Sequence, residues 1–426
     1  MKNSKVLCEE LAQGKYSQLL KEIYIDESMV PYQQERYIKA VKGYEEIFGE
    51  NDVEIYSAPG RSEVGGNHTD HQHGMVLATS INLDALAVVS RNDSNLIRVV
   101  SEGYEMSEVD ITDLKERFEE TGTTIGLIRG VAANLQERGY KLGGFDAYVT
   151  SDVLIGAGLS SSAAFEVIGG TIISGLFNDM QISPVVIAQA GQFAENVYFG
   201  KPCGLMDQMA CSVGGMIHID FADPENPVVE KVPSDFEGYQ YSLCIVDTMA
   251  SHANLTDDYA QIPAEMKKVA SLFKKDFLRE VTEEEFFGQI SGLRSVFGDR
   301  AVLRAMHFFE EEKRVEGQVQ ALREGRFQDF LNLVKASGDS SFKYLQNIYT
   351  NRDVQNQAMS VALGASEIIL GNHGVSRVHG GGFAGTIQVF VENGFVEEYR
   401  KAIEKIFGRG SCHVLKVRQK GGIRVL

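Results

Sequence analysis

Apolar side chains recur at helical spacing in several stretches of the chain. In residues 37–48 they fall three or four positions apart and a glycine follows, which predicts a helix that stops at Gly49. Three more apolar stretches predict helices at residues 125–138, 164–176 and 185–197. One long stretch dense in charged residues predicts a helical region at 257–324. Helices are therefore expected in both halves of the chain.

Runs of β-branched and aliphatic residues predict strands between these helices. A short strand at residues 53–55 leads toward Arg61, and residues 75–100 predict several antiparallel strands separated by turn residues such as Asn92-Asp93. Further strands are predicted at 145–153, 216–221, 239–246, 386–391 and 414–417. Because strands and helices mix without strict alternation, the pattern favours an α+β fold of two lobes, residues 1–215 and 216–426.

Charge and cysteine content narrow the class of protein. The 426 residues carry 41 Lys and Arg against 59 Asp and Glu, a net charge of −18, which argues against broad binding to nucleic acid or anionic membranes. Five cysteines without a Cys-x-x-Cys pair favour free thiols. The first 14 residues are polar, and no apolar run reaches about 18 residues. We expect a cytoplasmic protein with no obligatory protein partner.

A glycine- and serine-rich segment follows the strand predicted at 145–153. It reads Gly156-Ala157-Gly158-Leu159-Ser160-Ser161-Ser162-Ala163-Ala164 and opens an apolar helix. The N-terminus of a helix offers unpaired N–H groups and a positive dipole end, which together suit a phosphate. The common nucleotide loop is absent, since no Lys-Ser/Thr pair follows the glycines. The alternative is that the serines only cap the helix.

A second polar segment, Asn67-His68-Thr69-Asp70-His71-Gln72-His73, lies between predicted strands. So many directional hydrogen-bonding groups suit a ligand with several hydroxyls. Two alternatives remain open on the sequence, a metal site shared by His71 and His73 or a solvated hairpin tip.

Two more segments are candidates for chemistry. Asp207 lies among small and apolar residues and is either a buried structural acid or a catalytic group. Glu195 lies 12 positions earlier and is either a metal ligand or an exposed helical acid. Residues 379–385, His-Gly-Gly-Gly-Phe-Ala-Gly, allow the backbone to pass close to a ligand or to form a tight turn.

These segments, in this order, resemble the superfamily named for galactokinase, homoserine kinase, mevalonate kinase and phosphomevalonate kinase, and within it most closely the galactokinases. Residues 60–70 are similar to the N-terminal signature, 156–164 to the phosphate loop, 203–208 to the segment with the catalytic aspartate, and 379–385 to the third motif. The resemblance spans about residues 30–420. It implies the two-lobed small-metabolite kinase fold, with mixed and antiparallel sheets and the active site between the lobes.

The resemblance also implies a role for each candidate residue. Asp207 would contact the reacting sugar hydroxyl with Arg61 as the cation beside it, and Ser162 and Glu195 would bind Mg²⁺. The sugar-binding positions are Asn67, His68, Asp70 and Tyr259, and the ATP phosphates would be held by Gly156, Gly158, Leu159, Ser160, Ser161, Ser162 and Ala163.

The implied activity is transfer of the ATP γ-phosphate to the anomeric hydroxyl of galactose, which gives galactose 1-phosphate and ADP with Mg²⁺ as cofactor. Positioning and charge neutralisation supply most of the rate in such transfers. The alternatives are a kinase for an N-acetylated or otherwise altered hexose and a sugar- and ATP-binding regulator without turnover.

The chain departs from the galactokinase signature at three places. The family usually has Glu where this chain has Asn67, Asn-Leu or Asn-Ile where it has Glu63-Val64, and an aromatic residue where it has His71. An amide in place of a carboxylate at a sugar hydroxyl predicts a changed preference among hexoses, because polar mismatches are costly.

Overall fold

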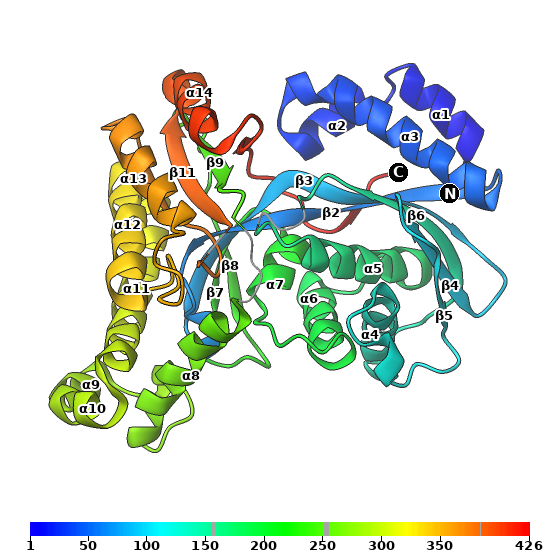
Figure 1. Ribbon diagram of the computed structural model, residues 1–426. Helices are drawn as coiled ribbons and strands as arrows, with labels where there is room; N and C mark the ends of the chain where they lie inside the picture. The colour runs from blue at the N-terminus through cyan, green and yellow to red at the C-terminus, as the bar shows by residue number, and fades with distance from the viewer. Residues whose placement is uncertain (155–157, 251–254, 384) are drawn as a thin grey trace.

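Two β-sheets flanked by helices form the protein, as the computed structural model shows (Figure 1). The structure describes residues 1–154, 158–250, 255–383 and 385–426. Within these residues one sheet has nine strands and the other has four.

The larger sheet is mixed. Its path runs β1-β2-β3-β6-β4-β5, β13 pairs with β2, and β7 lies between β3 and β8. Strands β4 and β6 pair in parallel and the other pairs are antiparallel. The nine strands are β1 (Lys2–Asn3), β2 (Asp52–Gly65), β3 (Met75–Arg91), β4 (Leu96–Ser101), β5 (Ser107–Asp110), β6 (Phe145–Ser151), β7 (Met216–Asp220), β8 (Val228–Val232) and β13 (Ile423–Arg424).

Helices cover both faces of this sheet (Figure 1). Successive side chains of β2 point to opposite faces, so Ile55 packs with the N-terminal helices while Tyr56 packs with the other group. The N-terminal helices are α1 (Ser4–Ala12), α2 (Ser17–Tyr24) and α3 (Val30–Phe48). The opposite group comprises α4 (Thr124–Glu137), α5 (Ser161–Asn178), α6 (Pro184–Phe193) and α7 (Met206–Val213).

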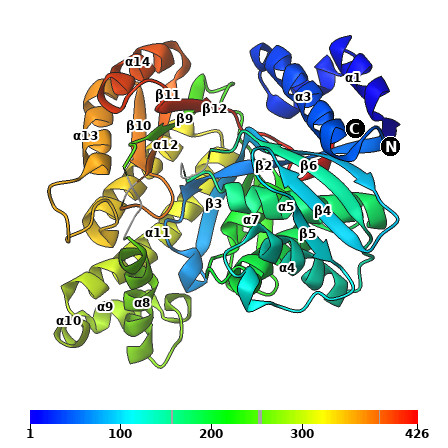
Figure 2. The same ribbon diagram turned by 45° about the vertical axis from the view of Figure 1, so that its right-hand side comes forward.

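The smaller sheet is antiparallel, in the order β10-β11-β9-β12, and also has helices on both faces. Its strands are β9 (Tyr241–Asp247), β10 (Gly374–Val378), β11 (Thr386–Glu392) and β12 (Cys412–Leu415). One face packs against α13 (Ala358–Leu370) and α14 (Val396–Phe407), and the other against α11 (Asp299–Arg323) and α12 (Phe327–Ser340). A helical extension beside α11 comprises α8 (Thr256–Leu272), α9 (Glu283–Gly288) and α10 (Ile290–Phe297) (Figure 2).

The predicted α+β class is confirmed, as is the helix that ends at Gly49, whose φ of 78° suits glycine. The expectation of several strands over residues 75–100 is confirmed only for the break after Arg91, because β3 runs unbroken from Met75 to Arg91 and β4 follows at Leu96. The central polar residues of β3, such as Asn82 and Asp84, are buried and hydrogen-bonded rather than in turns. The turn at Asn92-Asp93 does separate β3 from β4.

The division into lobes at residue 215 stays a prediction, but the larger sheet does not follow it. Strands β7 and β8 come after this position and still extend the sheet from β3. The C-terminal β13 pairs with β2 in the same sheet. The chain therefore returns to its first sheet at its end, a long-range pairing that no local pattern reveals.

Two observations bear on the expected location. None of the helices in the described parts of the chain combines the length and apolar character that a membrane crossing requires. All five cysteines are free thiols.

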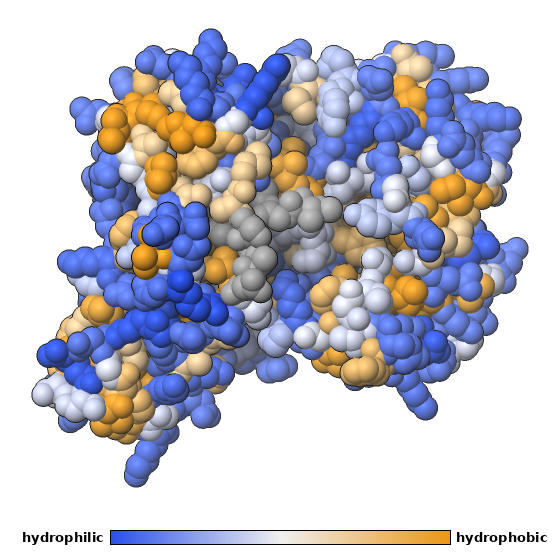
Figure 3. All heavy atoms as spheres, in the orientation of Figure 1, coloured by the Kyte–Doolittle hydropathy of each residue, from blue (hydrophilic) through white to orange (hydrophobic). Residues whose placement is uncertain are grey.

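Hydrophilic residues cover most of the face seen in Figure 3, and the apolar residues there lie in separate patches.

Candidate active site

The strand β2 carries the predicted signature, and its pairing with β3 is interrupted there twice. Register shifts occur between Pro59 and Arg61 and between Glu63 and Gly65. Such irregularities bend a strand and redirect its side chains, and they are frequent beside active sites. In this strand they flank Arg61, whose side chain is buried and directed at Asp207.

Asp207 lies in the first turn of α7 and forms a bidentate ion pair with Arg61 of β2. Arg61 Nε lies 2.7 Å from Oδ1 and Nη2 lies 2.8 Å from Oδ2, and Ser160 Oγ also donates to Oδ2. The Asp207 side chain keeps 32% of its surface exposed. Burial raises the pKa of Asp207, but the charge of Arg61 and the hydrogen bonds from Arg61 and Ser160 outweigh it, so the pKa is lowered. The carboxylate is therefore ionised and open to a ligand.

The predicted phosphate loop lies beside this pair, at the N-terminus of α5. Ser160 adopts a left-handed conformation with φ of 58°, and α5 begins at Ser161. Gly158 O accepts from Arg61 Nη1, and Leu159 O accepts from the Arg61 backbone N–H at 3.1 Å. Leu159 and Ala163 are buried in the core below. Gly156 lies outside the described residues.

The alternative that the serines only cap the helix does not hold for Ser160. Its hydroxyl donates to Asp207, and no side chain of the described residues caps this end of α5. Among the described residues the first-turn N–H groups thus have no side-chain acceptor and can donate hydrogen bonds to a ligand, as a phosphate site requires.

Glu195 and Ser162 lie side by side, with Ser162 Oγ 3.4 Å from Glu195 Oε1. Glu195 belongs to a π-helical turn, Ala194–Tyr198, of a kind often found at functional sites. No cluster of three or more His, Cys, Asp or Glu residues suited to a metal occurs in the described ranges. Mg²⁺ commonly takes only one or two protein carboxylates and completes its shell with phosphates and water, so one carboxylate and one hydroxyl fit it.

Asn67 is fully buried and bonded to the protein on both sides of its amide. Nδ2 donates to Glu63 Oε1 at 3.0 Å and to Gly380 O at 2.7 Å, while Oδ1 accepts from Asn347 Nδ2 at 2.8 Å. Glu63 in turn pairs with the buried Arg377 at 2.6 Å. The assignment of Asn67 to the sugar-binding positions stays a prediction, and in this structure its amide is bonded to protein groups.

Two other predicted sugar-binding side chains, those of His68 and Tyr259, contact the third glycine motif. His68 Nε2 lies 3.0 Å from Gly381 O, and the Tyr259 hydroxyl donates to Gly382 O at 2.6 Å. Burial lowers the pKa of His68 to about 3 and raises that of Tyr259 to about 12, so both are neutral. His68 Nδ1 is buried and has no hydrogen-bond partner among the described residues. With a proton on Nε2, this nitrogen is an acceptor for a ligand hydroxyl.

Asp70 connects the signature to the Asp207 segment. Its Oδ1 accepts from the backbone N–H of His71 at 2.9 Å. A side chain at Gly204 would place its Cβ 2.1 Å from Asp70 Oδ2, so any larger residue there would displace the Asp70 carboxylate. Asp70 therefore lies against the segment that leads into the helix of Asp207.

Both alternatives for the polar loop are contradicted. His73 stacks on Phe277 at a ring distance of 3.6 Å, and no group of three or more His, Cys, Asp or Glu residues suited to a metal includes His71 or His73 in the described parts of the chain. Asn67, Thr69 and Gln72 are fully buried, which excludes a solvated tip.

The third motif closes the site through its glycines. A Cβ on Gly382 would lie 2.0 Å from Asn347 O, and one on Gly381 would lie 2.4 Å from the Tyr259 ring. His379 bridges Ser62 Oγ at 3.1 Å and Thr386 Oγ1 at 2.9 Å. The motif thus touches the signature strand, α8 and the segment before α13. Ala384 lies outside the described residues.

The sequence did not reveal the buried residues that hydrogen-bond to the predicted site residues and fix their positions. Arg377 and Asn347 fix the signature loop, and Gln208 Nε2 donates at 2.9 Å to both Glu195 and Glu166. Only the Glu63–Asn67 pair left a local signal, since a carboxylate and an amide four positions apart flank a glycine pair. The other partners are distant in sequence.

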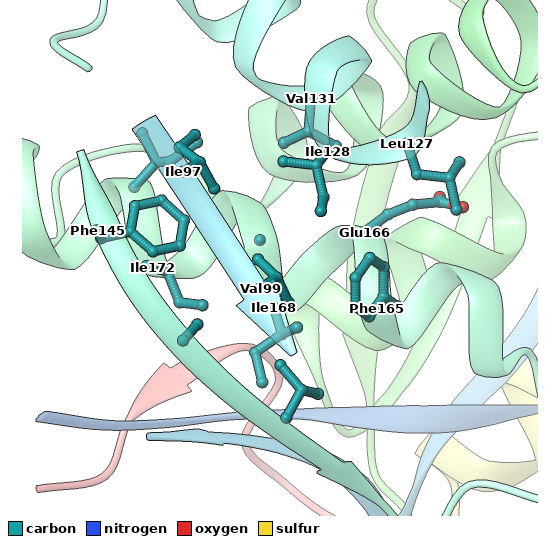
Figure 4. Close-up of a pocket in the computed structure, with 14 residues that line it drawn as sticks. Ile97, Val99, Leu127, Ile128, Val131, Phe145, Phe165, Glu166, Ile168 and Ile172 are labelled. Atoms are coloured by element: carbon teal, nitrogen blue, oxygen red, sulfur yellow. The ribbon is translucent and has the colours of Figure 1, made fainter. Parts of the chain in front are cut away.

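An apolar cavity of about 30 Å³ lies between the sheet and the phosphate-loop helix, lined from β4, β6, α4 and α5 (Figure 4). Glu166 is the only charged side chain in its lining. Burial and the nearby charge of Glu195 raise the pKa of Glu166 to about 8. The space suffices for about one water-sized molecule, so it is a packing gap rather than a nucleotide site.

Two family models match the chain where these residues lie. The galactokinase galactose-binding signature matches residues 42–91, and the N-terminal domain of the GHMP kinases matches residues 126–215. The first range contains Arg61 and Asp70, and the second contains the phosphate loop, Glu195 and Asp207.

Comparison with known proteins gives the same family over nearly the whole chain. The galactokinase of Streptomyces coelicolor is 31% identical over 381 residues, 88% of this chain and 94% of that protein. The galactokinase of Thermotoga maritima is 31% identical over 82% of this chain and 95% of its own.

Solved structures share the fold. Lactococcus lactis galactokinase complexed with galactose has a TM-score of 0.77 at 22% identity, covering 90% of this chain and 98% of that one. Methanococcus jannaschii mevalonate kinase has a TM-score of 0.60 at 16% identity, covering 85% and 98%. The extent of these matches, together with the four motifs gathered in one site, shows that the chain belongs to the galactokinase family.

Proposed function

We propose that this protein transfers the γ-phosphate of ATP to the anomeric hydroxyl of galactose, giving galactose 1-phosphate and ADP. The observation that carries this proposal is the bidentate Arg61–Asp207 pair at the open N-terminus of α5, inside a site built from the galactokinase motifs. In the reaction a bond forms between the sugar oxygen and the γ-phosphorus, and the bond from that phosphorus to ADP breaks.

The nucleotide side of the site rests on α5 and its loop. Backbone N–H groups of Ser161, Ser162 and Ala163 would hold the phosphates, with Gly158, Leu159 and Ser160 directly before them in the chain. Ser162 and Glu195 would hold Mg²⁺, which when bound neutralises phosphate charge.

Asp207 orients the sugar hydroxyl and accepts its proton. Its lowered pKa keeps it ionised at neutral pH and makes it a weak base. A strong base is not required, because phosphoryl transfer passes through a loose transition state in which positioning and charge stabilisation dominate. Arg61 fixes the carboxylate and supplies positive charge beside the transferring group.

The sugar side comprises His68, Asp70 and Tyr259. Their neutral ring nitrogen, carboxylate and phenol match a ligand that both donates and accepts hydrogen bonds. Asn67 acts through its neighbours, as it ties the signature strand to Gly380 and Asn347.

A second candidate is a kinase for another hexose, such as an N-acetylated one. The observation that favours it is the Glu63–Asn67 arrangement, which reverses the usual galactokinase order of amide and carboxylate, together with His71 in place of an aromatic residue. The cytoplasmic location stays part of the proposal, supported by the five free cysteines.

The test is ADP release by the purified protein with MgATP and a panel of sugars that includes galactose, N-acetylgalactosamine and glucose. Turnover with galactose above the other sugars supports the proposal. Turnover with another sugar alone replaces it with the second candidate, and sugar binding without ADP release favours a regulator.

A further inference from the structure

The two oxygens of the Glu195 carboxylate have different surroundings. Oε2 accepts from Gln208 Nε2 at 2.9 Å, on the buried side of α7. Oε1 lies on the side of the phosphate loop, 3.4 Å from Ser162 Oγ. The side chain is only 4% exposed, so its orientation is fixed. Oε1 is therefore the oxygen that this carboxylate offers to a metal held between Glu195 and Ser162.

A lysine already occupies that oxygen. Lys201 Nζ lies 2.7 Å from Glu195 Oε1, and the Lys201 backbone N–H donates to Glu195 O at 3.0 Å. The Lys201 side chain is 61% exposed, in contrast to its partner. Its ammonium is a compact charge on a flexible stem, so it can leave Glu195 without disturbing the core.

We propose that Lys201 is a tethered cation that excludes free divalent metal from Glu195 in the nucleotide-free protein. This inference rests on the proposed function for the identity of the metal site. Lysine and metal need the same oxygen, and two cations there repel each other strongly at the low effective dielectric of a protein surface. A metal that arrives with ATP brings phosphate charges, which give the displaced ammonium new partners. The chain thus selects the metal–nucleotide complex over the free metal.

The experiment measures Mn²⁺ binding to the nucleotide-free protein by electron paramagnetic resonance, with Mn²⁺ as the probe for Mg²⁺. Lys201→Met removes the charge at similar length and should tighten Mn²⁺ binding about fivefold, the change expected for loss of a partly exposed ion pair. Lys201→Arg keeps the charge and should bind as weakly as the original protein.

Two controls locate the effect. Lys21→Met also removes one positive charge and breaks a 2.7 Å ion pair, that between Lys21 of α2 and Glu27. Because this pair is distant in sequence from Glu195, the variant should leave Mn²⁺ binding unchanged. Glu195→Gln added to Lys201→Met should abolish the gain, because the site would lose its carboxylate.

Unchanged or weaker Mn²⁺ binding by Lys201→Met overturns the proposal, as does an equal gain in Lys21→Met or a gain that survives Glu195→Gln. Galactose-dependent ADP release is measured on the same preparations. If the Mn²⁺ shift occurs and galactose is not phosphorylated, the galactose kinase activity is contradicted, while competition between Lys201 and a divalent metal for Glu195 is supported. If galactose is phosphorylated without the shift, only this inference fails.

Discussion

Two arginine–carboxylate pairs lie two positions apart on β2 and have opposite environments. Arg61 pairs with Asp207, whose side chain is 32% exposed, whereas Glu63 pairs with Arg377 where the exposures are 4% and 0%. The pKa of Asp207 is lowered because Arg61 and Ser160 outweigh burial, but the pKa of Glu63 is raised because burial outweighs Arg377. The open pair suits chemistry, and the sealed pair suits positioning of the loop between the motifs.

The comparison shows that an ion pair's role follows from its access to ligand. Asp207 faces the phosphate loop and keeps accessible surface, so it can exchange protein contacts for a substrate hydroxyl. Glu63 has Arg377 and Asn67 as partners in a closed network, where any change leaves a buried group unsatisfied. Mutation of the Arg61–Asp207 pair should therefore change catalytic rate, whereas mutation of the Glu63–Arg377 pair should change stability.

Loss of the open carboxylate should have the largest effect. Asp207→Ala is expected to lower kcat about a hundredfold to ten-thousandfold, the range for loss of an acid–base group. Galactose binding measured by calorimetry should survive, because His68, Asp70 and Tyr259 remain. Turnover at the original rate would remove Asp207 from the mechanism.

Breaking the sealed pair should reduce stability instead. Arg377→Met leaves Glu63 buried without its cation and should cost about 3–5 kcal/mol of unfolding free energy. The loss should be greater at pH 8 than at pH 5, because a protonated Glu63 needs no counter-charge. The double variant Glu63→Gln/Arg377→Met is the matched control and should recover most of the thermal midpoint. A single variant as stable as the original protein would contradict the assigned role.

Exchange of the carboxylate and the amide between positions 63 and 67 should change stability less than loss of Arg377 does. Asn67→Glu places a second carboxylate within hydrogen-bonding distance of Glu63 and should cost about 1–3 kcal/mol. Glu63→Asn/Asn67→Glu restores one carboxylate and one amide, so its thermal midpoint should rise above that of Asn67→Glu. Equal midpoints would show that the two positions are independent.

A still smaller change is expected at the sugar side. Tyr259→Phe removes the hydrogen bond to Gly382 O, worth about 1 kcal/mol. The KM for galactose should rise up to about fivefold while kcat is kept, because the residue positions the sugar and not the phosphate. A fall in kcat with unchanged KM would place Tyr259 in the chemical step.

The smallest expected effect is that of pH on the open pair. A carboxylate with lowered pKa is active when ionised and loses activity only as pH falls through that lowered value. The kcat/KM for galactose at saturating MgATP should therefore stay flat from pH 8 to pH 6. An acid limb within this window would show that Arg61 does not control the ionisation of Asp207.

The sequence predicted the α+β class, four helices and the helical region at 257–324, because periodicity and glycine stops are local signals, but it did not predict α1, α2, α7 or α12 to α14. It could not predict the single long β3, since its buried polar residues look like turn residues until Asp84 is seen to bond Arg36 and Arg418. Family resemblance supplied the candidate site residues, and the structure brought them together. The burial of Asn67 depends on Asn347 and Arg377, which lie about 300 residues away, so no local pattern could reveal it.

Nuclear magnetic resonance of the product formed from ¹³C-labelled galactose and MgATP tests phosphorylation at the anomeric hydroxyl directly. The signal of carbon 1 should become coupled to phosphorus as ADP accumulates. Coupling at carbon 6, or no phosphorylated galactose while another sugar is consumed, would contradict this expectation.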